Sequence, residues 1–279
     1  MNHCKILASV IICCLTVLSA LSGTIDRKIR INGSMGELAV RVQLPDCEPA
    51  GKIPVVVLCH GFMGNMGGEL FDDITEDLLA DTIGVVRFDF NGHGESAGKF
   101  SEMTVPNEIE DAKAVISWVG DQSFTKNISL LGHSQGGVVA AMTAGELGYP
   151  RIRALVLLAP AAVLRDDALR GFTMGAAYDP WNAPDSVPMP NGKGLGRNYI
   201  ETARDLQIYP TASRYSGPAY VIHGMGDRVV PYTYGETFVR EMPEARLKLI
   251  EGEDHVFSKD TRGAARAAAD WLDAILNEK

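Results

Sequence analysis

The sequence has no cluster of lysine or arginine, and basic residues are scarce in it overall. Its 279 residues carry 26 Lys and Arg against 35 Asp and Glu, which gives a formal net charge of −9. Nucleic acids and anionic membrane surfaces attract proteins through concentrated positive charge. The composition therefore argues against both as partners.

Cysteine is also scarce, and no spacing of Cys and His resembles a metal site. Three of the five Cys lie within residues 1–22, which leaves Cys47 and Cys59 in the remainder. Cys59 falls in an apolar stretch and is most simply a small buried side chain, although an exported protein could pair it with Cys47. We expect neither a metal nor another cofactor.

Residues 1–22 are typical of an export signal. Lys5 is their only charged residue, and a mostly apolar, uncharged run follows from Ile6 to Leu21. That run is short for a membrane span, and the small side chains at its end suit cleavage. We predict a secreted or periplasmic protein, cleaved near residues 20–23 and without stable membrane association afterwards. An uncleaved anchor, or a lipoprotein attached through Cys13 or Cys14, is the less favoured alternative.

From residue 23 onwards, stretches typical of strands alternate with stretches typical of helices. A continuous apolar run such as Pro54–Cys59 is expected of a strand buried on both faces, whereas Lys28–Asn32 and Glu37–Leu44 suit a half-exposed antiparallel pair. The alternation predicts the α/β class, with a mostly parallel sheet covered by helices on both faces. The other predicted strands are Gly84–Phe90, Asn127–Leu131, Ile152–Leu158, Ala219–His223 and Arg246–Ile250, and the predicted helices are Gly68–Asp81, Val105–Val119, Gly137–Ala144, Tyr232–Glu241 and Lys259–Asn277.

The alternation breaks over residues 161–216. This stretch holds several aromatic residues together with several Pro and Gly. It is too long for a plain connection, so we predict a small lid subdomain inserted into a single domain of residues 23–279.

Two stretches match the pattern Gly-x-Ser-x-Gly. Ser134 lies between a strand-like run and a small-residue helical run, which is the strand–turn–helix arrangement of a nucleophile elbow. Ser96 matches the same pattern but follows its strand only after a loop and leads into no helix. We therefore predict Ser134 as the nucleophile, Ser96 as a loop residue, and the backbone N–H of Gln135 as one oxyanion donor.

A serine nucleophile needs a histidine base and a carboxylate that orients it. In a parallel sheet these partners belong in the loops that follow strands. His255 lies after the last strand, and Asp227 follows the strand before it, which gives the chain order Ser, acid, His. Glu253 and Asp254 are the competing acids, but their place beside the histidine suits solvated loop charges better. The N–H of Phe62, after the first buried strand, is the predicted second oxyanion donor.

These motifs together resemble the bacterial feruloyl (cinnamoyl) esterases of the α/β-hydrolase superfamily. The resemblance covers nearly the whole chain from about residue 28, and it rests on residues 60–62, 89–96, 132–137, 158–162 and 251–255. It implies the α/β-hydrolase fold and a serine carboxylesterase. It also implies that Asp167 and Tyr199 of the insert contact the ring hydroxyls of a hydroxycinnamate. Met174 stands where some relatives have a Gln that closes over the substrate, so the acyl preference stays open.

The leading prediction is hydrolysis of hydroxycinnamate esters of plant cell-wall sugars through an acyl-enzyme. The expected partners are therefore small phenolic-acid esters of sugars or oligosaccharides. A general short-acyl esterase, a monoacylglycerol lipase and a peptidase are alternatives within the hydrolases. An inactive α/β-hydrolase used as a binding module is the alternative from another class, and the complete set of Ser134, Asp227 and His255 speaks against it.

Overall fold

The structure, a computed structural model, describes residues 24–45, 51–190 and 192–277. The predicted signal at residues 1–22 and the predicted alternative pairing through Cys47 lie outside the described residues. Cys59 is buried and free, as the sequence predicts. No helix of the described ranges is long and apolar enough to cross a membrane.

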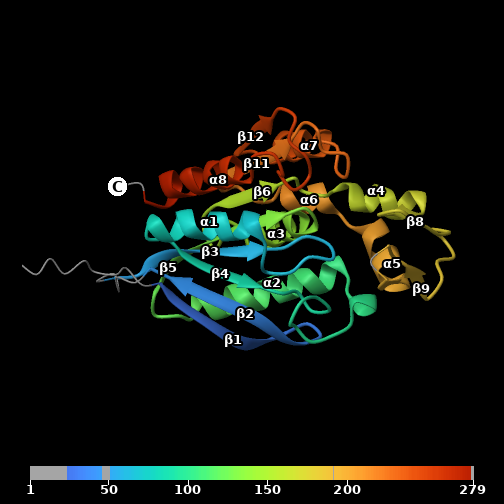
Figure 1. Cartoon of the computed structure of the whole chain (residues 1–279), viewed down its shortest axis with the longest axis horizontal. Helices are drawn as coiled ribbons and strands as arrows, with labels where there is room; N and C mark the ends of the chain where they lie inside the picture. Colours follow the sequence, from blue (N-terminus) through green and yellow to red (C-terminus); the bar gives the residue numbers. More distant parts are fainter. Residues whose placement is uncertain (1–23, 46–50, 191, 278–279) are drawn as a thin grey trace, which may run out of the picture.

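An eight-stranded sheet forms the centre of the fold, and it confirms the predicted α/β-hydrolase architecture (Figure 1). β2 is antiparallel to both of its neighbours, β1 and β4, and all the other pairs are parallel. In spatial order the strands are β1 (Ile25–Gly33), β2 (Gly36–Leu44), β4 (Gly84–Phe88), β3 (Ile53–Cys59), β5 (Thr125–His133), β6 (Leu155–Leu158), β11 (Ala219–Gly224) and β12 (Ala245–Ile250).

Helices cover both faces of the sheet and give it two apolar cores. The core on one face takes its helical side chains from α1 (Glu69–Ala80) and α8 (Thr261–Leu276). The other contains α2 (Val105–Gly120), α3 (Gln135–Leu147) and α7 (Thr233–Glu241). Along β3, Val55 and Val57 enter the second core and Val56 and Leu58 the first. A strand with both faces buried must be apolar throughout, which explains the unbroken run in the sequence.

The predicted strands and helices are all present, and their ends either match the prediction or differ from it by up to three residues. β4 stops at Phe88 instead of Phe90 because side chains take over the next backbone donors. The N–H of Phe90 donates to His60 Nε2 at 3.1 Å, and the N–H of Asn91 donates to Asp111 Oδ2 at 2.8 Å. These bonds turn the chain away from the sheet edge.

The segment between β6 and β11 carries its own small elements and lies beside one end of the main sheet (Figure 1). Its last helix packs closely on α3, because a Cβ on Gly145 would lie 2.0 Å from the Thr211 carbonyl oxygen. The elements are α4 (Val163–Arg170), β7 (Phe172–Thr173), β8 (Ala176–Ala177), β9 (Ser186–Pro188), β10 (Gly194–Gly196), α5 (Arg197–Asp205) and α6 (Ile208–Ala212).

Candidate active site

Ser134 stands at the sharp turn from β5 into α3, with φ 59° and ψ −123°. A non-glycine residue in this region of backbone space is strained by about 1–3 kcal/mol, so the surrounding packing must impose it. Two glycines make the close approach possible. A Cβ on Gly132 would lie 2.1 Å from the Gly136 carbonyl oxygen, and one on Gly136 would lie 2.2 Å from the Cys59 carbonyl oxygen. The turn therefore presents the Ser134 hydroxyl at the carboxyl end of the sheet.

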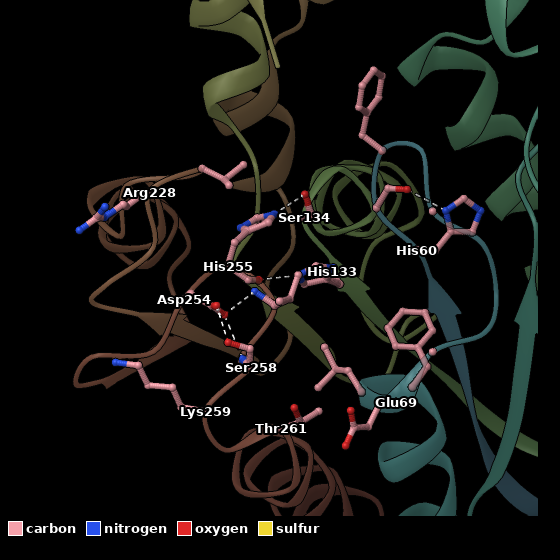
Figure 2. A pocket seen from close by; sticks show the side chains of 18 of the residues that line it. His60, Glu69, His133, Ser134, Arg228, Asp254, His255, Ser258, Lys259 and Thr261 are labelled. Atoms are coloured by element: carbon pink, nitrogen blue, oxygen red, sulfur yellow. Dashed lines mark hydrogen bonds between the residues drawn. The ribbon is translucent and has the colours of Figure 1, made fainter. Parts of the chain in front are cut away.

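The three residues predicted as the triad lie in one hydrogen-bonded chain. Ser134 Oγ is 2.9 Å from His255 Nε2, and His255 Nδ1 is 2.7 Å from Asp227 Oδ2. The first of these contacts is drawn in Figure 2. The arrangement leaves Nε2 free to accept the hydroxyl proton while Nδ1–H donates to the carboxylate.

Asp227 is held by more donors than the sequence predicted. Its Oδ1 accepts from the N–H groups of Val229 and Val230, both at 2.8 Å, and His223 Nε2 lies 3.2 Å from Oδ2. The same His223 nitrogen is 2.9 Å from the Val230 carbonyl oxygen, which can only accept, so His223 Nε2 carries a proton. Burial alone would raise the pKa of Asp227, but hydrogen bonds from His223 and His255 hold it well below the usual range. The carboxylate is therefore ionised when His255 needs it.

Two further histidines near the nucleophile are neutral and structural. Burial lowers the pKa of His133 to about 4, and its Nε2 donates to the His255 carbonyl oxygen at 2.8 Å. Burial also lowers the pKa of His60 to about 4. His60 Nδ1 donates to the Gly61 carbonyl oxygen at 2.9 Å, and its Nε2 accepts from Phe90. His60 thus acts through its two hydrogen bonds, which fix the loop after β3.

Both predicted oxyanion donors border the nucleophile. Gln135 is the first residue of α3, so its N–H has no acceptor within the helix. The loop carrying Phe62 passes close to Ser134, since a Cβ on Gly61 would lie 2.9 Å from the Ser134 Cβ. The Phe62 ring packs against Phe100 at 5.4 Å and Tyr199 at 5.5 Å between centroids, which limits the movement of the loop.

Tyr199 has a different place from the one that the resemblance implied. Its side chain is 2% exposed and is not part of the pocket wall. Its hydroxyl donates to Gln135 Oε1 at 2.7 Å, and Gln135 Nε2 donates to Glu108 Oε2 at 2.8 Å. Burial raises the pKa of Glu108 well above its usual value. The tyrosine therefore ties the insert to the nucleophile elbow, and its hydroxyl is not available to a substrate in this arrangement.

Of the other two predicted substrate contacts, Met174 lines the pocket beside Ser134 and Asp167 does not. Asp167 accepts from Arg170 at 2.5 Å, and it does not line the pocket beside Ser134. Burial raises its pKa, while Arg170 lowers it. Met174 does line that pocket, with φ 47° and a side chain that is 42% exposed.

The competing serine and the competing acids have structural partners. Ser96 Oγ donates to the Asp89 carbonyl oxygen at 2.5 Å and accepts from the Ala39 N–H at 2.8 Å, which suits the predicted loop residue. The expectation that Glu253 is a solvated charge is wrong, because this side chain is buried and accepts from the Lys259 N–H at 3.3 Å. Asp254 accepts from Ser258 and is partly exposed.

The cavity beside Ser134 has a volume of about 1140 Å³ and is drawn in Figure 2. His60, Phe62 and His255 are among the residues that line it. Within the described ranges, no group of three His, Cys, Asp or Glu side chains could hold a metal ion. The contacts of Ser134, His255 and Asp227 provide a histidine-activated hydroxyl at the edge of this cavity.

Known proteins are similar to this chain over a region that includes Ser134. Residues 52–180 match the profile of a family described as serine aminopeptidase, S33. The lysophosphatidylserine lipase ABHD12 of Danio rerio is 29% identical over 190 residues, which are 66% of this chain and 46% of that lipase. The chain thus matches less than half the length of this relative. The monoacylglycerol lipase of Mycolicibacterium smegmatis is 27% identical over 246 residues, which are 77% of this chain and 84% of that lipase.

Among solved structures, Est1E from Butyrivibrio proteoclasticus with ferulic acid bound is similar over 87% of this chain and 96% of that chain. The TM-score is 0.83 and the sequence identity is 27%. Alpha/beta hydrolase domain-containing protein 10 from mouse has a TM-score of 0.68 at 19% identity, a likeness that concerns the fold alone.

Proposed function

We propose that this chain, which belongs to the α/β-hydrolase superfamily, is a serine carboxylesterase that hydrolyses hydroxycinnamate esters of sugars. The observation that carries the reaction type is the contact chain from Ser134 Oγ through His255 to Asp227, at 2.9 and 2.7 Å. It lies at the elbow turn and opens on a cavity of about 1140 Å³. A hydroxyl, a base and an oriented acid in this geometry suit acyl transfer.

The reaction has two halves. Ser134 Oγ attacks the ester carbonyl carbon while His255 Nε2 takes its proton, and Asp227 stabilises the imidazolium that forms. The negative charge on the carbonyl oxygen is stabilised by the N–H groups of Phe62 and Gln135. His255 returns the proton to the alcohol oxygen, the C–O bond breaks, and an acyl-enzyme remains. A water molecule, deprotonated by His255, then releases the acid and restores Ser134.

The acyl class is the finer part of the proposal. It is supported by the sequence motifs and by the likeness to Est1E, whose structure contains ferulic acid. A lipase-like esterase is the second candidate, supported by the similarity to the mycobacterial monoacylglycerol lipase. The insert weighs against it, because its Pro and Gly residues and its charged side chains do not form a continuous apolar cover.

Two measurements test the reaction type and the acyl class separately. A fluorophosphonate should label the wild-type protein and leave Ser134→Ala unlabelled, and the absence of labelling in both would refute a reactive serine. Rates should then be compared on methyl ferulate, methyl p-coumarate, methyl cinnamate, nitrophenyl esters of rising chain length and a monoacylglycerol. Highest kcat/KM on the monoacylglycerol would replace the feruloyl proposal by the lipase-like one.

We also propose that the protein is secreted or periplasmic, on the basis of the apolar run from Ile6 to Leu21. Terminal sequencing of the protein recovered outside the cytoplasm should find an N-terminus near residues 20–23. Recovery only in the cytoplasm, with Met1 retained, would refute this proposal.

A further inference from the structure

The side-chain amide of Gln135 is held at both of its polar atoms, and one of the two partners is a carboxyl group. Gln135 Nε2 donates to Glu108 Oε2 at 2.8 Å, and Gln135 Oε1 accepts from the Tyr199 hydroxyl at 2.7 Å. Glu108 is 1% exposed, and the other two side chains are 2% exposed. The three residues belong to α2, α3 and α5, so a buried polar contact joins three elements directly behind the nucleophile. Such a satisfied network holds the residue at its centre in one orientation.

Glu108 is a buried carboxyl group without a cation. Its ion-pair contact within the described residues is with His93, whose Nδ1 lies 4.0 Å from Oε1, which is beyond hydrogen-bond distance. Neither ring nitrogen of His93 has a hydrogen-bond partner in the described ranges, and burial lowers the pKa of His93 to about 3. A protonated His93 would bury two N–H groups without acceptors, so this ring is neutral and cannot offset a charge on Glu108.

The other titratable groups around Glu108 offer no positive charge either. Burial raises the pKa of Glu108 well above its usual value, the hydrogen bond from Gln135 lowers it, and Asp111 on the same helix raises it. Cys59 on β3 and Tyr199 on α5 can only become negative, and burial raises the pKa of both. Glu108 is therefore an uncharged acid at neutral pH.

An uncharged acid suits this place better than a carboxylate. The N–H of Gln135 is the predicted donor to the carbonyl oxygen that becomes negative during acyl transfer. A carboxylate in contact with the same residue would repel that negative charge, and a buried site screens such repulsion poorly. A neutral carboxyl group keeps an acceptor for Gln135 Nε2 and adds no charge.

We infer that Glu108 is a positioning residue of the oxyanion hole, which holds Gln135 from α2 as an uncharged hydrogen-bond acceptor. The inference rests on the proposed acyl transfer at Ser134 but not on the acyl class. It predicts that the acceptor at position 108 matters and that the ionisable group does not, so a glutamine should replace Glu108.

Glu108→Gln and Glu108→Met form a matched pair, because both side chains are close to glutamate in size and only glutamine keeps an acceptor. Glu108→Met should lower kcat by about tenfold with KM little changed, since loss of a complete oxyanion donor costs about a hundred- to a thousandfold. The loss should be equal on nitrophenyl acetate and methyl ferulate. Glu108→Gln should keep kcat within a few-fold. An unchanged kcat in Glu108→Met, or an equal loss in both variants, would overturn the inference.

Asp111→Ala distinguishes positioning of Gln135 from general damage to α2. Asp111 is buried on the same helix, and its carboxylate accepts from the N–H groups of Ser34 and Asn91 at 2.7 and 2.8 Å. This variant should lower Tm and keep kcat within a few-fold. A loss of kcat as large as that of Glu108→Met would show that damage to α2 is sufficient, and the role of Glu108 would be refuted.

The charge of Glu108 can be tested without a reaction, and this test remains if Glu108→Met does not fold. An uncharged Glu108 means that the folded chain binds one proton more than the unfolded chain above about pH 4.5, so it makes stability fall as pH rises. Glu108→Gln removes this fall. The folding equilibrium constant of Glu108→Gln relative to wild type should therefore rise about tenfold per pH unit from about pH 5 upward. A ratio that does not change with pH would show an ionised Glu108 and would contradict the inference.

Labelling by a fluorophosphonate separates this inference from the proposed function, because its phosphoryl oxygen needs the same donors but no ester is hydrolysed. Wild type and Glu108→Gln should be labelled about tenfold faster than Glu108→Met. If this order is found but wild type hydrolyses no ester, the role of Glu108 stands and the proposed function fails. If wild type hydrolyses esters and all three proteins are labelled at equal rates, the proposed function stands and the role of Glu108 fails.

Discussion

Replacing Tyr199 by Phe should weaken the whole active site instead of a single substrate contact. The hydroxyl that this change removes donates to Gln135 Oε1 at 2.7 Å, in a place where Tyr199 and Gln135 are each 2% exposed. An acceptor left without a donor in such a place costs about 1–3 kcal/mol. For a chain of this size, Tm should fall by about 2–4 °C for each kcal/mol lost.

Tyr199→Phe should also lower kcat, because Gln135 follows the nucleophile and carries an oxyanion donor. Loss of a complete oxyanion donor costs about a hundred- to a thousandfold in kcat, so a donor that is only less well held should cost about tenfold. The loss should appear in kcat, with KM little changed, and it should be equal on nitrophenyl acetate and methyl ferulate. An acetyl group is too short to reach the insert, so an equal loss can only come from the elbow.

Tyr178→Phe is the matched control, since it removes a hydroxyl that contacts Thr173 within the insert at 2.6 Å and does not involve Gln135. Steady-state kinetics on both esters and thermal unfolding should be measured for the two variants side by side. A loss confined to methyl ferulate would refute this reasoning and return Tyr199 to the phenolic-pocket role that the family resemblance implied. An unchanged Tm and kcat would show that the hydrogen bond from Tyr199 to Gln135 contributes neither to stability nor to catalysis.

Three further expectations concern the triad and its surroundings. Ser134→Ala should abolish ester hydrolysis, and circular dichroism should show that the fold is retained. Ser96→Ala should keep kcat within a few-fold. It should lower the free energy of unfolding by about 1–3 kcal/mol, because Ser96 forms hydrogen bonds with two backbone groups. Asp227→Asn should lower kcat on the order of 10⁴-fold, and Glu253→Gln, which keeps an acceptor for the Lys259 N–H, should leave kcat within a few-fold. The pKa of His133 is about 4 in the folded protein and about 6.5 when unfolded, so the unfolded chain binds the proton first and stability falls as pH drops from about 6.5 to 4. His133→Gln should make this fall shallower in denaturant titrations, and an unchanged pH slope would contradict the assignment.

The sequence was sufficient for the fold because most of its strands are buried on both faces. A run such as Val55 to Cys59 is apolar at every position, since alternate side chains enter different cores. The choice between the two serine motifs was also available from the sequence, because Ser134 alone lies between a strand and a helix. Both inferences depend on neighbours in the chain, where residue type and backbone conformation are directly linked.

Contacts between distant segments were not predictable in the same way. Tyr199 and Gln135 are 64 positions apart, and nothing in the residues around Tyr199 indicates that its hydroxyl meets the elbow. Glu253 lies in a run of charged residues that suits solvent, yet its burial follows from the way the loop folds back on the Lys259 N–H. Packing of the whole chain decides such orientations, so a residue-by-residue reading could name these side chains without finding their partners.

The histidines illustrate the difference between what the sequence alone identifies and what depends on contacts between distant segments. The motif order identified His255 as the base, since it follows the last strand and comes after Asp227 in the chain. The structure adds that three others support it: His133 donates to the backbone of His255, His223 holds Asp227, and His60 fixes the loop after β3. Each of these three has a ring nitrogen occupied by a backbone group, and none bridges the nucleophile and the acid. A histidine becomes a base only where one ring nitrogen meets the hydroxyl and the other meets a carboxylate, and that condition depends on tertiary structure.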